Sequence, residues 1–102
     1  MTGNQSAFSF ARDPEAAFWA FHRANPHVYD WLKREALRLR RNGRDHYSAR
    51  TLVHAFRHHT AMTTSGETFK INDHTSPFYA RLLMREEWEL GEFFKTRRAV
   101  AD

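Results

Sequence analysis

Apolar residues between Asn25 and Gly43 recur at steps of three and four positions: Val28, Tyr29, Leu32, Ala36 and Leu39. This spacing places them on one face of a helix. Asn25 can cap that helix, and Pro26 suits its first position because the N–H that proline lacks has no partner there. Gly43 fits the left-handed position just past the end. The pattern therefore predicts a core helix whose other faces are polar and mostly basic.

Three further stretches also have helix signals. Asp13 and Pro14 predict the start of a helix that runs to about residue 24 and ends before the next proline. Ser48 is expected to cap a helix over about 49–61, with its apolar residues turned inward. Ser76 caps a fourth helix in the same way, and Trp88 to Phe94 form a last short helix. The second and third helices, joined by a Gly-containing turn, resemble a helix-turn-helix unit.

The stretch from Thr60 to Ile71 has a pattern typical of strands and a turn, unlike the helical spacing before it. Threonines precede a Ser65-Gly66 turn, and β-branched and aromatic residues follow it, a pattern that predicts a small β-hairpin. The predicted fold class is therefore mainly α: a compact helical domain with a helix-turn-helix and a small hairpin, as in winged-helix proteins. We expect residues 1–12 to be a flexible arm, 13–97 a single domain, and 98–102 a frayed tail.

Composition agrees with one compact core. The chain has 102 residues, of which 41% are hydrophobic and 15% aromatic, which argues against disorder. It contains no cysteine, so neither a disulfide framework nor thiolate chemistry is expected. No secretory signal and no apolar run of roughly 20 residues occurs. These features predict a soluble, cytoplasmic protein with no membrane partner.

Positive charge is concentrated in one part of the chain. The formal net charge is +4, yet the segment from Lys33 to Arg50 holds seven Lys or Arg against two acidic residues. Such a basic block on a nearly neutral body is typical of a surface that faces a polyanion. An ordinary solvated helix face is the alternative, and composition does not separate the two.

Nucleic-acid binding is the leading functional hypothesis. In a helix-turn-helix, the helix after the turn lies in the major groove of double-stranded DNA, where Arg50, His54 and Arg57 would reach bases or phosphates. The residues expected to contact the nucleic-acid backbone are Lys33, Arg34, Arg38, Arg41 and Arg44, with Lys70 on the hairpin. The hypothesis requires residues 33 to 57 to form one continuous cationic surface. A homodimer would suit paired half-sites.

A protein-binding module is the second class. Aromatic side chains dominate the energetics of interfaces, and the candidate anchors are Trp19, Trp31, Tyr79 and Trp88. The same rings could instead complete a small core. An exposed cluster of two or more of them would favour protein binding.

Catalytic and metal chemistry find little support. His54 and His58 are one helical turn apart, but no third ligand stands at a motif spacing. The carboxylates from Glu86 to Glu92 suit a solvated face, and no glycine-rich phosphate loop occurs. We therefore expect no enzyme activity, no catalytic residue, no metal and no cofactor.

Three stretches carry a resemblance to a known group of proteins. They are FxxFHxxNPxVY (18–29), the Gly43, Tyr47 and Ser48 step, and FKINDHTSPFYARLLM with a later EFFKTR (69–97). Together they resemble a family of small, mostly uncharacterised phage and prophage proteins. The family tends to have Phe-Lys-Leu-Asn-Asn-Asn, a variable pair, then Tyr-Ala-Arg-Leu; Asp73 and His74 depart from its Asn run. The resemblance implies a phage setting, in which helical proteins bind DNA or, as inhibitors and adaptors such as anti-defence proteins, disable a host protein.

Overall fold

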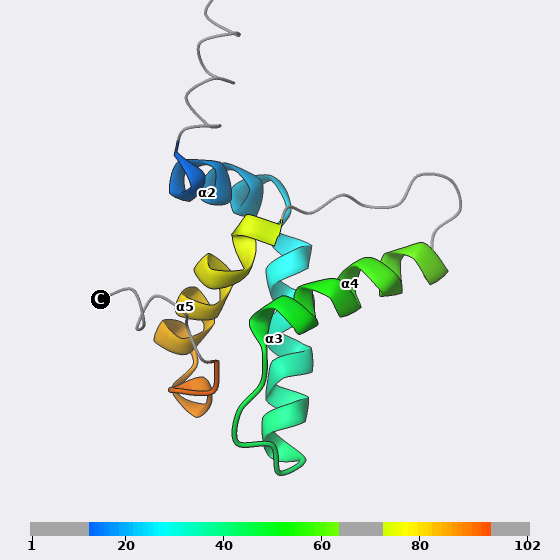
Figure 1. Cartoon of the computed structure of the whole chain (residues 1–102), viewed down its shortest axis with the longest axis vertical. Helices are drawn as coiled ribbons and strands as arrows, with labels where there is room; N and C mark the ends of the chain where they lie inside the picture. Colours follow the sequence, from blue (N-terminus) through cyan, green and yellow to red (C-terminus); the bar gives the residue numbers. More distant parts are fainter. Residues whose placement is uncertain (1–12, 64–72, 95–102) are drawn as a thin grey trace, which may run out of the picture.

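The computed structural model describes residues 13–63 and 73–94 (Figure 1). They form four α-helices: α2 (Pro14–Ala24), α3 (Pro26–Arg41), α4 (Ala49–Thr63) and α5 (Ser76–Glu86). Two 3-10 turns, η1 (Asp73–Thr75) and η2 (Trp88–Leu90), flank α5. The fold is mainly helical, as the sequence predicts. The expected arm (1–12) and tail (98–102) lie outside the described residues.

The first two helices meet at the predicted corner, but one cap differs from the prediction. The Asp13 carboxylate accepts a hydrogen bond from the backbone N–H of Ala16 at 3.1 Å, which confirms it as the cap of α2. Asn25 makes no side-chain cap for α3. Its side-chain amide instead donates to the carbonyl of Phe21 at 3.0 Å. Asn25 therefore satisfies the end of the preceding helix, because the corner places it one turn beyond Phe21.

The end of α3 follows the predicted glycine signal. Gly43 has a φ of +103°, which a residue with a Cβ adopts only with strain. The N–H of Arg44 donates to the carbonyl of Leu39 and that of Gly43 to the carbonyl of Arg40, both at 3.1 Å. These two bonds make a Schellman ending that satisfies carbonyls left over at the helix end.

The winged-helix features are not found in the described part of the chain. Thr60 to Thr63 belong to α4 rather than to a strand, because the helix continues two residues beyond the expected end. The rest of the predicted hairpin, residues 64–72, lies outside the described residues. Within those residues no strand occurs, although Tyr47 and Phe94 form an isolated parallel bridge. The α3–α4 connection spans residues 42–48, longer than the three or four residues of a helix-turn-helix turn.

Ser76 also differs from its predicted role. It is the first residue of α5, which follows η1 directly. The cap position falls to Thr75, whose side chain makes no capping hydrogen bond. The Ser76 side chain is buried, and its Oγ has no hydrogen-bond partner among the described residues. The helix starts one residue earlier than expected because the preceding 3-10 turn leads straight into it.

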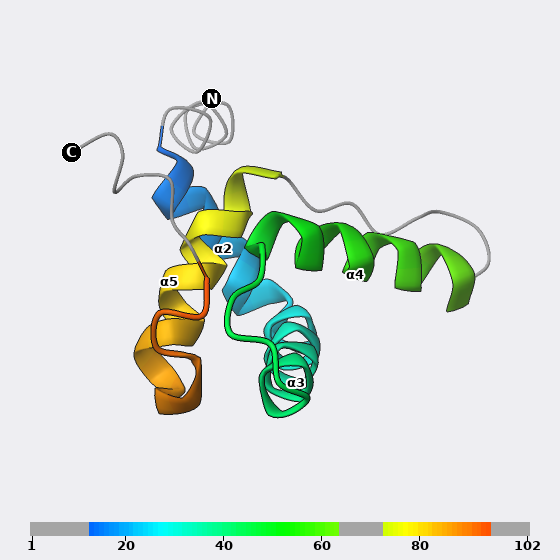
Figure 2. The same ribbon diagram turned by 60° about the horizontal axis from the view of Figure 1, so that its bottom comes forward.

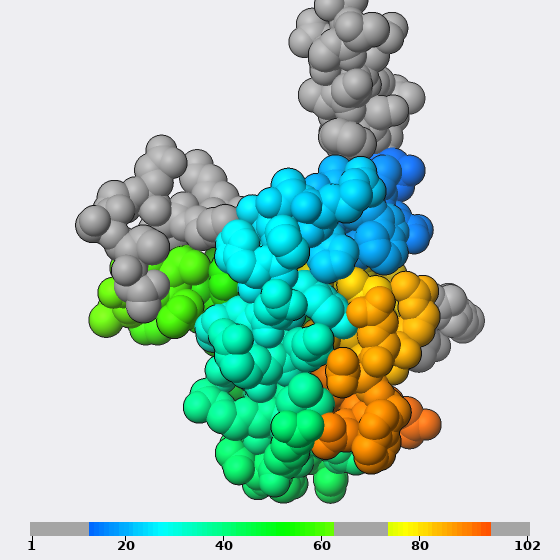
Figure 3. Space-filling model, turned by 180° about the vertical axis from the view of Figure 1, so that it is seen from behind, coloured from blue at the N-terminus to red at the C-terminus, as the bar shows by residue number. Residues whose placement is uncertain are grey.

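The core combines apolar residues from every helix and from the segment after α5. Figure 3 shows α3 running between α4 on one side and α5 with η2 on the other. The buried hydrophobic residues are Phe18, Val28, Tyr29, Leu32, Ala36, Leu52, Val53, Phe56, Tyr79, Ala80, Leu82, Leu83, Leu90, Phe93 and Phe94. The apolar face predicted for α3 is thus the central layer of the core.

Helix α4 buries its apolar side chains in its first half. Leu52, Val53 and Phe56 are buried there. The second half projects away from α3 and α5, as both ribbon views show (Figures 1 and 2). Met62 near its end is 72% exposed. The fold therefore presents a helix that solvent surrounds on several sides.

Candidate nucleic-acid interface

The basic residues of α3 meet carboxylates from the far end of the chain. Arg41 donates to both oxygens of the Glu89 carboxylate, with Nε at 3.0 Å and a terminal nitrogen at 2.6 Å. This contact lowers the pKa of the Glu89 carboxyl and raises the pKa of Arg41. Lys33 Nζ lies 3.8 Å from a Glu87 oxygen. Residues immediately after α5 thus neutralise one flank of α3.

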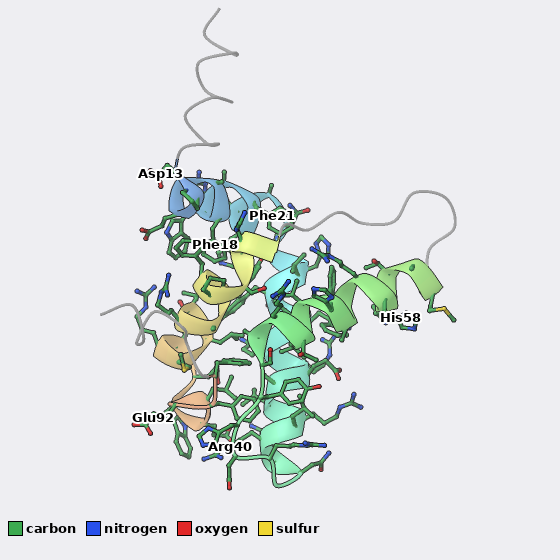
Figure 4. The ribbon with its side chains drawn as sticks, in the orientation of Figure 1. Asp13, Phe18, Phe21, Arg40, His58 and Glu92 are labelled. Carbon is green, nitrogen blue, oxygen red and sulfur yellow. The ribbon has the colours of Figure 1, made fainter. Side chains whose placement is uncertain are left out.

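Two more arginines of α3 also contact carboxylate or carbonyl oxygens. Arg38 pairs with Glu35 on the same helix. Arg40, labelled in Figure 4 at the lower end of α3, donates through Nε to the backbone carbonyl of Glu89 at 3.2 Å. A terminal nitrogen of Arg40 lies 3.4 Å from a carboxylate oxygen of Asp45. Arg40 was not among the predicted contact residues, and its role is to fasten η2 to α3.

These pairs correct the expectation of one continuous cationic surface from residue 33 to residue 57. Lys33, Arg38 and Arg41 were expected to contact a nucleic-acid backbone, but each faces a carboxylate. Exposed ion pairs contribute little stability, yet they cancel the charge that a phosphate would meet. The flank of α3 beside η2 is therefore a weak candidate for polyanion binding.

Arg34 and Arg44 differ from those three residues. Both are exposed, and within residues 13–63 and 73–94 no carboxylate lies within ion-pair distance of either. Arg44 stands in the connection that leads from α3 into α4. These two side chains remain candidates for contacts with phosphates.

Helix α4 carries the remaining predicted residues. Ser48 caps it as expected, because its Oγ accepts a hydrogen bond from the Thr51 N–H at 3.1 Å. Arg50 and His54 are exposed on the helix, and Arg57 is half-buried. Lys70 lies outside the described residues. The sequence of α4 contains no Asp or Glu, in contrast to the carboxylates that surround α3.

The four aromatic interface candidates do not form one exposed cluster. Tyr79 is only 1% exposed and packs edge-on against Phe18 with ring centroids 4.8 Å apart. It is a core residue, because α5 turns this side chain towards α2, and burial raises the pKa of its hydroxyl. Trp19 is half-buried against Phe18. Tyr79 is therefore excluded as a surface anchor.

The other two tryptophans have opposite surroundings. Trp31 is half-buried between α3 and α4, with its ring 5.3 Å from that of Phe56 and 5.4 Å from that of His59. Trp88 is 88% exposed on η2. Of the four candidates, Trp88 alone presents its whole ring to solvent.

A group of aromatic rings packs together near the corner between α2 and α3. His22 stacks parallel to Phe18 at 5.8 Å and lies edge-on to Tyr29 at 5.2 Å. The Tyr29 hydroxyl donates to a Glu86 carboxylate oxygen at 2.6 Å, and burial together with this contact raises the pKa of Tyr29. These ring contacts make His22 a half-buried residue packed at the edge of the core.

Residues 13–63 and 73–94 contain neither a metal-binding cluster nor a membrane-spanning helix. There, no group of three or more His, Asp or Glu side chains is placed to hold a metal ion. Likewise, none of the four described helices has the length and apolar character needed to cross a bilayer.

Comparison with family models, with curated proteins and with solved structures finds no match to this chain. The case for function therefore depends on the geometry of the chain itself.

Proposed function

We propose that the protein binds nucleic acid, double-stranded DNA in particular, through the outer face of α4 in a regulatory role. The observation that carries this proposal is the composition and position of α4. It is a projecting helix whose exposed residues include Arg50 and His54 and whose sequence holds no acidic residue. An α-helix of this kind fits the major groove of B-form DNA.

The hypothesis drawn from the sequence requires one continuous cationic surface over residues 33–57, and carboxylates interrupt that surface. The proposal is therefore confined to a smaller surface centred on α4. Arg50, His54 and Arg57 on α4 would face the groove, while Arg34 and Arg44 would meet phosphates beside it. Lys33, Arg38 and Arg41 are left out because they face carboxylates. Binding would be dominated by phosphate contacts and would fall steeply as salt rises.

The test is a gel-shift assay with random duplex and single-stranded DNA at two salt concentrations. We expect wild type to bind duplex at low salt and Arg50→Glu/Arg57→Glu to lose about 100-fold in affinity or more. The matched control is Arg23→Glu/Arg85→Glu, which makes the same change in net charge at exposed positions on α2 and α5. Equal binding by wild type and the α4 variant would overturn the proposal.

A second candidate function is a phage-encoded inhibitor or adaptor that docks on a host or phage protein. The exposure of Trp88 favours it, since a bare tryptophan is a typical interface anchor. The aromatic cluster that would favour this function more strongly is not present among the described residues. If wild type binds neither form of DNA at low salt, this second function becomes the better proposal.

A further inference from the structure

Two large apolar side chains stand out from the described surface. Trp88 on η2 is 88% exposed, and Met62 near the end of α4 is 72% exposed. Large apolar residues that remain in solvent indicate surfaces that could be buried on association. Neither residue is accounted for by the proposed groove contacts of Arg50 and His54.

The turn that carries Trp88 is held firmly in place. Leu90, the last residue of this turn, and Phe93, shortly after it, are fully buried. Glu89 accepts hydrogen bonds from Arg41 through its carboxylate and from Arg40 through its carbonyl. Because the backbone is already ordered, burying the Trp88 ring costs little additional conformational entropy.

The two exposed residues have opposite electrostatic surroundings. Residues 86–92 contain four glutamates; Glu86 and Glu92 are exposed, while Glu87 and Glu89 share their charge with Lys33 and Arg41. Residues 46–66, which include α4, contain no acidic residue. Met62 follows the exposed His58 by one turn on the same face of α4. Trp88, which lies among glutamates, is thus complementary to Met62, which lies on the basic helix α4.

The two surfaces cannot meet within one molecule. His58 and Glu92 lie on opposite sides of the molecule in Figure 4. We propose that η2 of one copy docks on the outer face of α4 in a second copy. The Trp88 ring packs on Met62 and His58, with sulfur–aromatic and ring–ring contacts adding to burial. Glu86 and Glu92 face the basic side chains of α4.

Such a contact is heterologous, because each copy uses two different surfaces. It leaves one free η2 and one free α4 on every pair, so assembly continues into a chain or closes into a ring. It therefore differs from the two-fold dimer expected for a helix-turn-helix protein. The contact is small and depends on charge, so we infer weak association that salt suppresses.

Sedimentation velocity across a range of protein concentrations at low and high salt tests this proposal. We expect the average mass of wild type to rise with concentration, and to rise less at high salt. Trp88→Ala and His58→Glu/Met62→Glu change only exposed side chains, so each variant should fold and remain monomeric. The control Arg23→Glu lowers net charge by the same two units on α2 and should associate like wild type.

Mixing the two defective variants gives the sharpest result. Trp88→Ala keeps an intact α4, and His58→Glu/Met62→Glu keeps an intact η2, so together they should form a one-to-one dimer and nothing larger. A wild type that stays monomeric overturns the proposal. So does a Trp88→Ala variant that associates like wild type, or a mixture that stays monomeric. None of these readouts depends on nucleic acid, so the outcome is separate from that of the gel-shift assay.

Discussion

Helices α3 and α4 are both basic and pack against one another, but the fold treats their charges differently. On α3, Lys33 and Arg41 face Glu87 and Glu89, and Arg38 faces Glu35. On α4, no acidic residue occurs in the helix, and its second half projects away from the body. The carboxylate contacts of α3 therefore come both from its own Glu35 and from the segment after α5, whereas α4 contributes no carboxylate of its own.

The difference follows from the place of each helix in the fold. The segment after α5 must pack its apolar residues Leu90, Phe93 and Phe94 on the core, and this packing carries its glutamates along the flank of α3. The projecting half of α4 lies on the other side of α3 from η2 (Figure 3). The neutralisation of Lys33 and Arg41 thus depends on what packs beside α3, since Glu87 and Glu89 come from outside the helix.

The largest predicted change in stability comes from a variant that weakens the packing of α4 on α3. Phe56 is 2% exposed and contacts Trp31 of α3. We expect Phe56→Ala to lower the free energy of unfolding by about 3–5 kcal/mol, because it removes a buried ring and leaves a cavity. Urea denaturation followed by circular dichroism measures this change.

Two further variants keep the Phe56 experiment informative. Phe56→Leu should cost about 1.5 kcal/mol or less and stay folded if the alanine variant does not. Thr51→Ala, an exposed position on the same helix, should change stability by no more than about 0.5 kcal/mol. A cost below about 1 kcal/mol for Phe56→Ala would show that α4 is held by other contacts.

The second prediction compares single arginines on the two helices. Arg50→Gln should lower the slope of log affinity for duplex DNA against log salt by about 0.9, the value for one phosphate contact. Arg41→Gln should leave the slope unchanged, because Glu89 already occupies that guanidinium. Gel-shift titrations over several salt concentrations provide both slopes. Equal changes for the two variants would remove the distinction between the helices.

The third prediction compares the loss of the serine that caps α4 with the loss of a buried serine in α5. Ser48→Ala removes the oxygen that accepts from the Thr51 N–H and should cost about 1 kcal/mol. Ser76→Ala removes a buried Oγ with no partner among the described residues and should be neutral or slightly stabilising. Urea denaturation of both variants compares the two costs. A larger loss from Ser76→Ala than from Ser48→Ala would contradict both assignments.

The smallest effect should come from the carboxylate that neutralises α3. Arg41 holds the pKa of Glu89 below its ordinary value of 4.5, so the folded state favours the ionised form. This contribution is complete above the pKa of the unfolded chain and disappears as pH falls through the lower pKa of the folded state. Glu89→Gln should therefore be slightly less stable than wild type at pH 7.

Measuring stability at several pH values separates the loss of the Arg41–Glu89 ion pair from a general packing effect of the substitution. We expect the difference in unfolding free energy between wild type and Glu89→Gln to stay constant down to about pH 5 and to shrink below pH 4.5. Glu92→Gln, at an exposed site outside the described ion pairs, should show no such change. A difference that grows as pH falls would mean that the pair does not stabilise the folded state.

Local signals predicted much of the helical framework. Asp13, Gly43 and Ser48 act where the sequence places them, because caps and the left-handed ending depend on residues only a few positions apart. The inward faces of α3 and α4 also follow their spacing. Asn25 and Ser76 failed as predicted caps because a neighbouring helix or turn decided which backbone group each could reach.

The candidate site was less predictable, because its members are far apart in the chain. Arg41 and Glu89 are 48 positions apart, and no local pattern relates them. The glutamates of residues 86–92 suit a solvated face in the sequence, yet two of them pair with α3. The same limit applies to the aromatic residues: Tyr79 is buried and Trp88 exposed, although both are aromatic residues in helical segments.

The sequence alone determined where three of the four described helices begin, which faces α3 and α4 bury, and that positive charge gathers between residues 33 and 57. These features follow from backbone capping and hydrophobic periodicity, which act over one or two turns. Only the tertiary structure decided that Lys33 and Arg41 of α3 face distant glutamates and that the second half of α4 projects from the body. Packing of Leu90, Phe93 and Phe94 into the core sets that arrangement, because burial of their side chains outweighs the small contribution of the surface ion pairs.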